Sequence, residues 1–97
     1  MSEQKKAKRF YVSGRVQGVG YRYFAHGAAE RHGVSGYVRN LRDSRVEVYA
    51  IGTEEQLRAL RDELRQGPRH AVIEEIAEAE AELPRAFTAG FSIDQDN

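Results

Sequence analysis

The chain of 97 residues carries 15 acidic and 15 basic side chains, and its formal net charge at pH 7 is zero. This length suits one small domain, and a neutral chain has no overall field that would recruit nucleic acid or an anionic membrane. Because the chain has no cysteine, a disulfide framework, a thiolate metal site and a cysteine-nucleophile phosphatase are excluded.

The first eight residues are polar and basic, apart from Met1 and Ala7. We expect a disordered tail over residues 1–8, followed by a single domain over residues 9–97. The beginning of the chain lacks the apolar stretch of a secretory signal, and no segment approaches the roughly 20 apolar residues of a membrane span. The sequence therefore predicts a cytoplasmic protein with no membrane partner.

The first predicted strand begins at Arg9, where apolar and polar residues start to alternate up to Val16. A period of two is typical of a half-buried strand. After a glycine-rich stretch, apolar residues recur at helical spacing until Gly33: Tyr21, Phe24, Ala25, Ala28 and Ala29. This spacing predicts an amphipathic helix packed on one side.

Residues 34–41 and 46–51 are rich in β-branched and aromatic side chains and flank a polar stretch. They are predicted to form a hairpin whose turn spans residues 42–45. The next segment, residues 53–56, reads Thr-Glu-Glu-Gln and has the pattern of a capping box. It predicts a second helix that ends at Gly67-Pro68 and buries Leu57, Leu60 and Leu64.

Residues 72–83 carry conflicting patterns. Their alanines and glutamates favour a helix, whereas the strict alternation from residue 77 onward favours a strand. We follow the alternation and interpret Glu74-Glu75, which breaks it, as a bulge. With a short last strand at Phe91 and Ile93, the element order predicts an α+β, ferredoxin-like βαββαβ sandwich, in which two helices cover one face of an antiparallel sheet.

The stretch from residue 14 to 22, Gly-Arg-Val-Gln-Gly-Val-Gly-Tyr-Arg, joins the first strand to the first helix. Its glycines allow successive N–H groups to turn inward at the helix N-terminus and form an anion-binding concavity. Arg22 opposes the helix dipole by about 0.3–1 kcal/mol, and a bound anion would remove this conflict. Glycines alone are weak evidence of phosphate binding, and on them alone an ordinary strand-to-helix turn is the favoured interpretation. Tyr23 stands where a dinucleotide fingerprint needs its third glycine, so nucleotide binding is disfavoured.

Asn40 lies just before the polar turn, where asparagine most often serves turn geometry. Its amide is also able to orient a water molecule without changing protonation state. Three histidines, His26, His32 and His70, do not have metal-ligand spacing, and we expect them at the surface. Arg39, Arg42 and Arg45 are interpreted as a solvated basic patch, with attraction of an anionic substrate as the alternative.

Residues 14–22 and 36–48 together resemble the two signature motifs of the acylphosphatase family. The resemblance extends to Gly52, to Gly67-Pro68 and to the ending Phe91-Ser92-Ile93. It implies a ferredoxin-like sandwich that hydrolyses carboxyl phosphates to carboxylate and phosphate. One departure is Ser44, where the family usually has glycine, and it bears on the geometry of the turn.

The resemblance also implies site residues. Arg22 would bind the phosphoryl group, and Asn40 would orient the attacking water. The backbone amides of the loop would bind the phosphoryl group as well, here those of Gln17, Gly18, Val19, Gly20, Tyr21 and Arg22.

The chemistry of an acyl phosphate needs few further groups. Its leaving carboxylate has a pKa of about 4, so a general acid is not required. Positioning and charge stabilisation serve the rest of the reaction. We therefore expect no metal and no cofactor, and a phosphate oxygen of the substrate that takes up the water proton. A monomer acting on a small acyl phosphate, with no nucleic-acid partner, is expected.

Two alternatives stay open at this point. One is a non-catalytic ferredoxin-like module that binds phosphate or another anion, and the presence of Asn40 together with Arg22 argues against it. The other is an RNA-binding domain of similar topology. The neutral charge and the lack of a ribonucleoprotein signature on a central strand argue against that domain.

Overall fold

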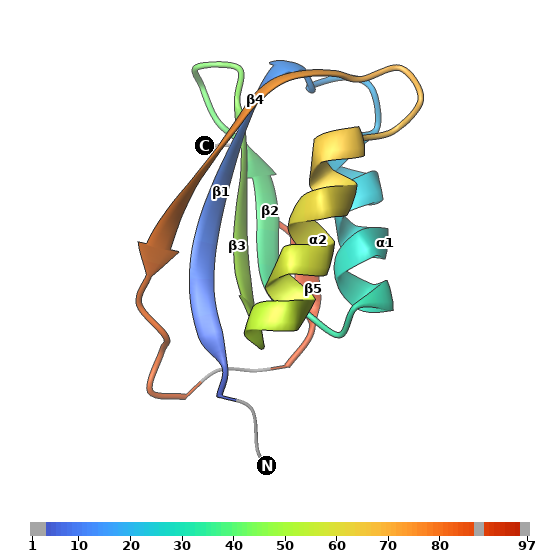
Figure 1. The fold of residues 1–97 in the computed structure, drawn as a ribbon. Coiled ribbons are helices and arrows are strands. Elements are labelled where there is room, and N and C mark those ends of the chain that lie inside the picture. The colour runs from blue at the N-terminus through green and yellow to red at the C-terminus, as the bar shows by residue number, and fades with distance from the viewer. Residues whose placement is uncertain (1–3, 87–88, 96–97) are drawn as a thin grey trace.

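A mixed β-sheet with two helices on one of its faces makes up the described part of the chain (Figure 1). The computed structural model describes residues 4–86 and 89–95. In these residues the sheet has five strands in the order β4-β1-β3-β2-β5. The elements in chain order are β1 (Lys6–Arg15), α1 (Tyr21–Arg31), β2 (Ser35–Asn40), β3 (Val46–Gly52), α2 (Glu54–Gln66), β4 (Val72–Ala81) and β5 (Phe91–Ile93). The predicted α+β, ferredoxin-like βαββαβ class is confirmed.

Strand β1 begins at Lys6, three residues earlier than the sequence pattern predicts. Ala7 is only 3% exposed and pairs with Ile51 of β3 on one side and Ala81 of β4 on the other. Lys6 to Lys8, which we expected in a disordered tail, therefore belong to the sheet, whereas residues 1–3 lie outside the described residues. The alternation was hidden because Lys8 occupies a helix-facing position, where it forms an ion pair in place of apolar contacts.

The sheet is mixed, which corrects the expectation of an antiparallel sheet. Strands β1, β3, β2 and β4 pair antiparallel, but β5 runs parallel to β2. The reason lies in the path of the chain: β4 ends at the end of the sheet where β2 begins (Figure 1). A strand that starts from this end and joins the free edge of β2 must run in the same direction as β2.

Strand β4 follows the period-two pattern, although its residues also favour a helix. Its pairing with β1 shifts where Ser13 pairs with Glu75 and Gly14 pairs with Ile73, so Glu74 is an extra residue on β4. The predicted bulge is confirmed, and the strand ends at Ala81 instead of residue 83. Long-range pairing along β1 thus outweighs the local helix propensity of alanine and glutamate.

The core lies between the helices and the sheet. Helix α2 starts with the predicted capping box, in which Thr53 and Gln56 exchange hydrogen bonds. In the centre, the Tyr21 hydroxyl of α1 donates a 2.7 Å hydrogen bond to the Leu64 carbonyl of α2, and burial raises the pKa of Tyr21. The buried side chains around this contact include Phe10, Val12, Ala25, Ala28, Val38, Val48, Leu57 and Leu60.

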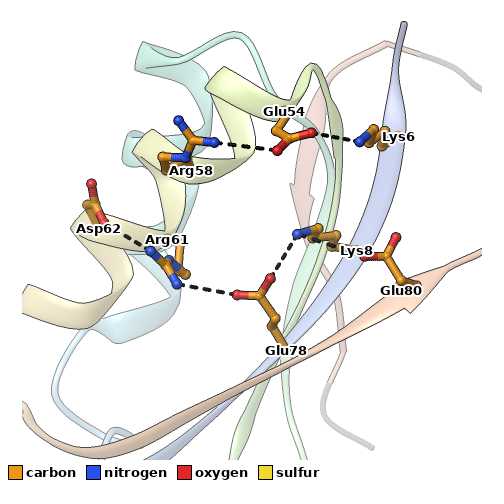
Figure 2. A network of polar contacts seen from close by, with 8 residues as sticks. All are labelled: Lys6, Lys8, Glu54, Arg58, Arg61, Asp62, Glu78 and Glu80. Atoms are coloured by element: carbon orange, nitrogen blue, oxygen red, sulfur yellow. Dashed lines mark hydrogen bonds and ion pairs between the residues drawn. The ribbon is translucent and has the colours of Figure 1, made fainter.

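A polar network joins the exposed side of α2 to β1 and β4 (Figure 2). The Lys6 ammonium lies 2.7 Å from Glu54, and the Lys8 ammonium lies 2.8 Å from Glu78. Glu78 also faces Arg61 of α2 at 3.7 Å. The acidic side chain of Glu78 on β4 therefore helps to hold α2 against the sheet.

The described helices are too short and too polar to cross a membrane.

Candidate active site

The glycine loop and the β2–β3 turn lie at the same end of the sheet (Figure 1). Strands β1 and β2 are each antiparallel to β3, so they run in the same direction and finish at the same end. The loop that follows β1 leads into α1, and Asn40 is the last residue of β2. The topology thus brings together two segments that are about 20 residues apart in the chain.

A cavity of about 90 Å³ lies between these two segments. Arg22 and Asn40, the two residues predicted from the sequence to be catalytic, both line it. Of the predicted loop residues, Gln17 and Val19 do not line the cavity, and Tyr23 lines it although the sequence pattern did not point to it. The complete lining is Val16, Gly18, Gly20, Tyr21, Arg22, Tyr23 and Asn40.

The start of α1 has no side-chain cap. Gly20 occupies the N-cap position with φ of 80° and supplies no capping hydrogen bond, and the first turn contains no acidic residue. The first N–H groups of any α-helix have no partner within the helix. Gly18 also has a positive φ, of 77°, which favours glycine, and a Cβ there would meet no atom within 4 Å. The loop therefore presents an open concavity with backbone donors, which favours an anion.

Arg22 places a positive charge in this same first turn. The helix dipole disfavours a cation at this end, and the missing acidic residue leaves that effect without compensation from the turn itself. The half-buried side chain of Arg22 lines the cavity. An anion in the cavity would interact favourably with the guanidinium group and with the helix N-terminus together.

Asn40 carries a buried acceptor without a partner. The residue is 8% exposed, and its Oδ1 atom has no hydrogen-bond partner among the described residues. A buried polar atom of this kind costs about 1–3 kcal/mol when it stays unsatisfied. Since Asn40 lines the cavity, the missing donor is supplied most simply by a molecule bound there.

Gln17 ties the loop to the β2–β3 turn. Its side-chain amide nitrogen donates hydrogen bonds to the carbonyls of Leu41, at 2.9 Å, and Arg45, at 3.0 Å. From the sequence, Gln17 was assigned only through its backbone amide. No sequence pattern indicated the role of the side chain, because both acceptors are backbone carbonyls of a distant segment.

The β2–β3 turn contains a strained residue at Ser44. Its φ of 82° lies in the left-handed region, which glycine adopts at no steric cost. Ser44 therefore introduces backbone strain into the turn. The turn still closes through a hydrogen bond from the Ser44 N–H to the Leu41 carbonyl. Asp43 accepts a hydrogen bond from the Arg45 backbone N–H, which lowers the pKa of Asp43.

Two of the three arginines interpreted as a solvated patch hold ion pairs. Arg39 lies 2.6 Å from the buried carboxylate of Glu47. Arg45 lies 2.8 Å from Asp43, and its guanidinium group covers the ring of Tyr11. Of these three arginines, Arg42 is the one that is exposed and has no ion pair within the described residues.

The three histidines lie in different ion-pair surroundings in the described part of the chain. His26 lies 3.6 Å from Glu30, and His32 lies 2.6 Å from Glu63. The side chains of both histidines are half-buried, whereas the sequence predicted them at the surface. Within residues 4–86 and 89–95, no group of three or more His, Cys, Asp or Glu side chains is arranged to hold a metal ion. The described lining of the cavity likewise contains no carboxylate and no imidazole.

Comparisons with known proteins show the family to which the chain is similar. The family model described as acylphosphatase matches residues 8–93. The acylphosphatase of Solibacter usitatus is 53% identical over 78 residues, which are 80% of this chain and 81% of the relative. That of Pasteurella multocida is 51% identical over 81 residues, 84% of this chain and 90% of the relative.

Among solved structures, the acylphosphatase from Bacillus subtilis superposes with a TM-score of 0.86 at 33% sequence identity. The match covers 94% of this chain and 99% of that protein. The sequence similarity and the fold therefore agree over nearly the same residues. The chain belongs to the acylphosphatase family.

Proposed function

We propose that this acylphosphatase binds the phosphoryl group of its substrate in the cavity between the glycine loop and Asn40. There it hydrolyses a carboxyl phosphate to carboxylate and inorganic phosphate. One observation carries the proposal: the guanidinium-bearing Arg22 and the unsatisfied Oδ1 of Asn40 line the same small cavity at a helix N-terminus.

The loop and Arg22 bind the negative charge of the phosphoryl group. The backbone amides of the predicted loop residues that line the cavity, Gly18, Gly20, Tyr21 and Arg22, surround the phosphoryl oxygens. The fork of the guanidinium group donates two parallel hydrogen bonds. In a loose transition state the charge is spread over the three equatorial oxygens. Fixed donors aimed at these oxygens stabilise the transition state without having to reorganise.

Asn40 orients the nucleophile. Its buried Oδ1 accepts a hydrogen bond from a water molecule, which directs a lone pair of the water toward phosphorus. This contact satisfies the acceptor that has no partner in the described residues. Because an amide does not titrate, the orientation is independent of pH over the working range.

The reaction balances without further groups. The new bond joins the water oxygen to phosphorus, the bond from phosphorus to the bridging oxygen breaks, and its electron pair leaves with the carboxylate. A phosphoryl oxygen takes up the water proton, since no carboxylate or imidazole lines the described cavity. The described lining has no carboxylate, the ligand through which proteins usually hold Mg²⁺, so the proposed mechanism uses no metal and no cofactor. The cytoplasmic location, the monomeric state and the organisation of the chain as a single domain stay predictions from the sequence.

Hydrolysis of benzoyl phosphate in excess EDTA tests the mechanism. The parent should turn over in EDTA, and both Arg22→Ala and Asn40→Ala should lower kcat by about 10²–10³-fold. Arg42→Ala is the matched control, because Arg42 is an exposed arginine outside the cavity. Asn40→Ala should keep the free energy of unfolding, since the acceptor that it removes had no partner among the described residues.

The other outcomes separate the alternatives. A parent that binds phosphate but shows no turnover would support the non-catalytic anion-binding module. Turnover that disappears in EDTA would contradict the metal-free mechanism. A kcat for Asn40→Ala within threefold of the parent would contradict the role of Asn40 in orienting water.

A further inference from the structure

Tyr23 presents a large apolar side chain beside the cavity, and the proposed mechanism does not use it. Among the described residues, it is the most exposed large apolar side chain, at 75%, compared with 54% for Val72 and 42% for Leu83. It follows Arg22 directly in the first turn of α1 and lines the same cavity. The ring contacts found in the described residues do not include Tyr23.

The cavity is too small for a whole acyl phosphate with a large acyl group. A protein cavity of about 150 Å³ takes up a single benzene ring, whereas this cavity measures about 90 Å³. If the phosphoryl group occupies it, an aromatic acyl group must lie outside, at the mouth. The residues at the mouth therefore determine which contacts the acyl group makes.

Tyr23 is the only residue in the described lining with exposed apolar surface at the mouth. Val16 and Tyr21 are each 1% exposed, so they belong to the wall and not to the rim. Gly18 and Gly20 have no side chain, and Arg22 and Asn40 face the phosphoryl group in the proposed mechanism. An acyl group that extends out of the cavity therefore meets one exposed apolar side chain at the mouth, the ring of Tyr23.

We propose that the Tyr23 ring packs against the acyl group of the substrate and makes the enzyme prefer acyl phosphates with an aromatic or large apolar acyl group. The proposal rests on the function proposed above. A packed pair of aromatic rings contributes a free energy that corresponds to about a 3- to 10-fold change in kcat/KM. A small acyl group such as acetyl covers little of the ring and therefore gains less free energy from this contact.

The test compares benzoyl phosphate with acetyl phosphate. The kcat/KM for each is measured for the parent, Tyr23→Ala and Tyr23→Phe, with Val72→Ala as a control that truncates an exposed apolar residue on β4. In Tyr23→Ala the ratio of benzoyl to acetyl kcat/KM should fall about 3- to 10-fold. Tyr23→Phe and Val72→Ala should retain the parent ratio, because the first keeps the ring and the second lies outside the cavity.

Inhibition by inorganic phosphate separates the acyl contact from damage to the loop. Phosphate has no acyl group, so its inhibition constant should be the same in Tyr23→Ala and in the parent. An unchanged substrate ratio in Tyr23→Ala would overturn the proposal, as would an equal loss for both substrates together with weaker phosphate inhibition. A parent that hydrolyses neither substrate would instead refute the proposed function.

Discussion

The helix-free face of the sheet and the cavity end both gather arginine side chains, but they differ in how their polar groups are satisfied. On the sheet face, the carboxylate of Glu47 is 4% exposed and lies 2.6 Å from Arg39 and 3.2 Å from Arg9. Arg9 also covers the ring of Tyr49, which stacks on Tyr37. These charges and rings satisfy one another and cover a face that no helix protects.

At the cavity end, unfavourable features accumulate. Asn40 Oδ1 is buried without a partner in the described residues. Ser44 has a φ of 82°, and α1 begins without a side-chain cap or an acidic residue in its first turn. Each of these features lowers stability in the absence of a ligand.

The difference separates structural from functional polar groups. Buried polar groups in native proteins are nearly all hydrogen-bonded, so an exception calls for a reason. The arginines of the sheet face resemble a binding surface in composition, yet their partners are already present in the fold. The cavity end leaves room for a partner that arrives with the substrate.

The largest expected effect on stability is at the sheet face. Glu47→Gln removes the charge that pairs with Arg9 and Arg39. Loss of one member of a buried ion pair costs about 3–5 kcal/mol. Because both arginines reach solvent, we expect a smaller loss, about 1–3 kcal/mol in urea unfolding. The kcat/KM should stay within twofold of the parent. Glu75→Gln, an exposed carboxylate without an ion pair in the described residues, is the control. A loss of activity without a loss of stability would remove the distinction between the two regions.

The link between the loop and the turn is tested by Gln17→Ala. It removes the donor to two backbone carbonyls and lets the loop shift relative to Asn40. We expect kcat to fall about tenfold through misplacement of the reacting groups, and stability to fall by about 1 kcal/mol. Gln17→Glu keeps the size of the side chain but has no N–H donor, so it should not rescue kcat. Rescue by Gln17→Glu would show that the side chain acts through packing alone.

The strained turn should gain stability from Ser44→Gly. Glycine adopts the positive φ of this position without steric conflict, and we expect a gain of about 0.5–1 kcal/mol after the entropy of glycine in the unfolded chain is included. Ser13→Gly, at a β1 position without positive φ, should lose stability instead. Equal effects at the two serines in thermal unfolding would show that the turn is not strained.

The smallest effect concerns acid. Hydrogen bonding to Arg31 lowers the pKa of Glu63 from its ordinary value of 4.5, and His32 acts in the same direction. A lowered pKa in the folded state means that this contribution is present above pH 4.5 and is lost as the pH falls through the folded pKa. Glu63→Gln should therefore be about 0.2–1 kcal/mol less stable at pH 7. The difference from the parent should shrink as the pH falls below 4.5 and disappear once Glu63 is protonated in the folded state. If Glu63→Gln is still less stable than the parent in urea unfolding at acid pH, its loss of stability does not come from the ionised Glu63 carboxylate.

Much of the fold follows from local patterns. The capping box at Thr53 and the leucine spacing of α2 are properties of neighbouring residues, and both are confirmed. The bulge at Glu74 is visible as a break in alternation. The sequence-based expectation was wrong about the beginning of β1, and it described the sheet as antiparallel, whereas β5 runs parallel to β2. The first depends on an ion pair with Glu78, and the second on the path of the chain around the sheet.

For the site, the sequence alone determined the loop of residues 14–22 and the conflict of Arg22 with the helix dipole, because both are set by backbone preferences within one contiguous segment. Only the tertiary structure decided that Asn40 is buried with an unsatisfied acceptor. It also decided that Gln17 joins the loop to the turn and that Tyr23 stands exposed at the cavity. These features depend on contacts between segments about 20 residues apart, which the pairing of β2 and β1 with β3 brings to one end of the sheet.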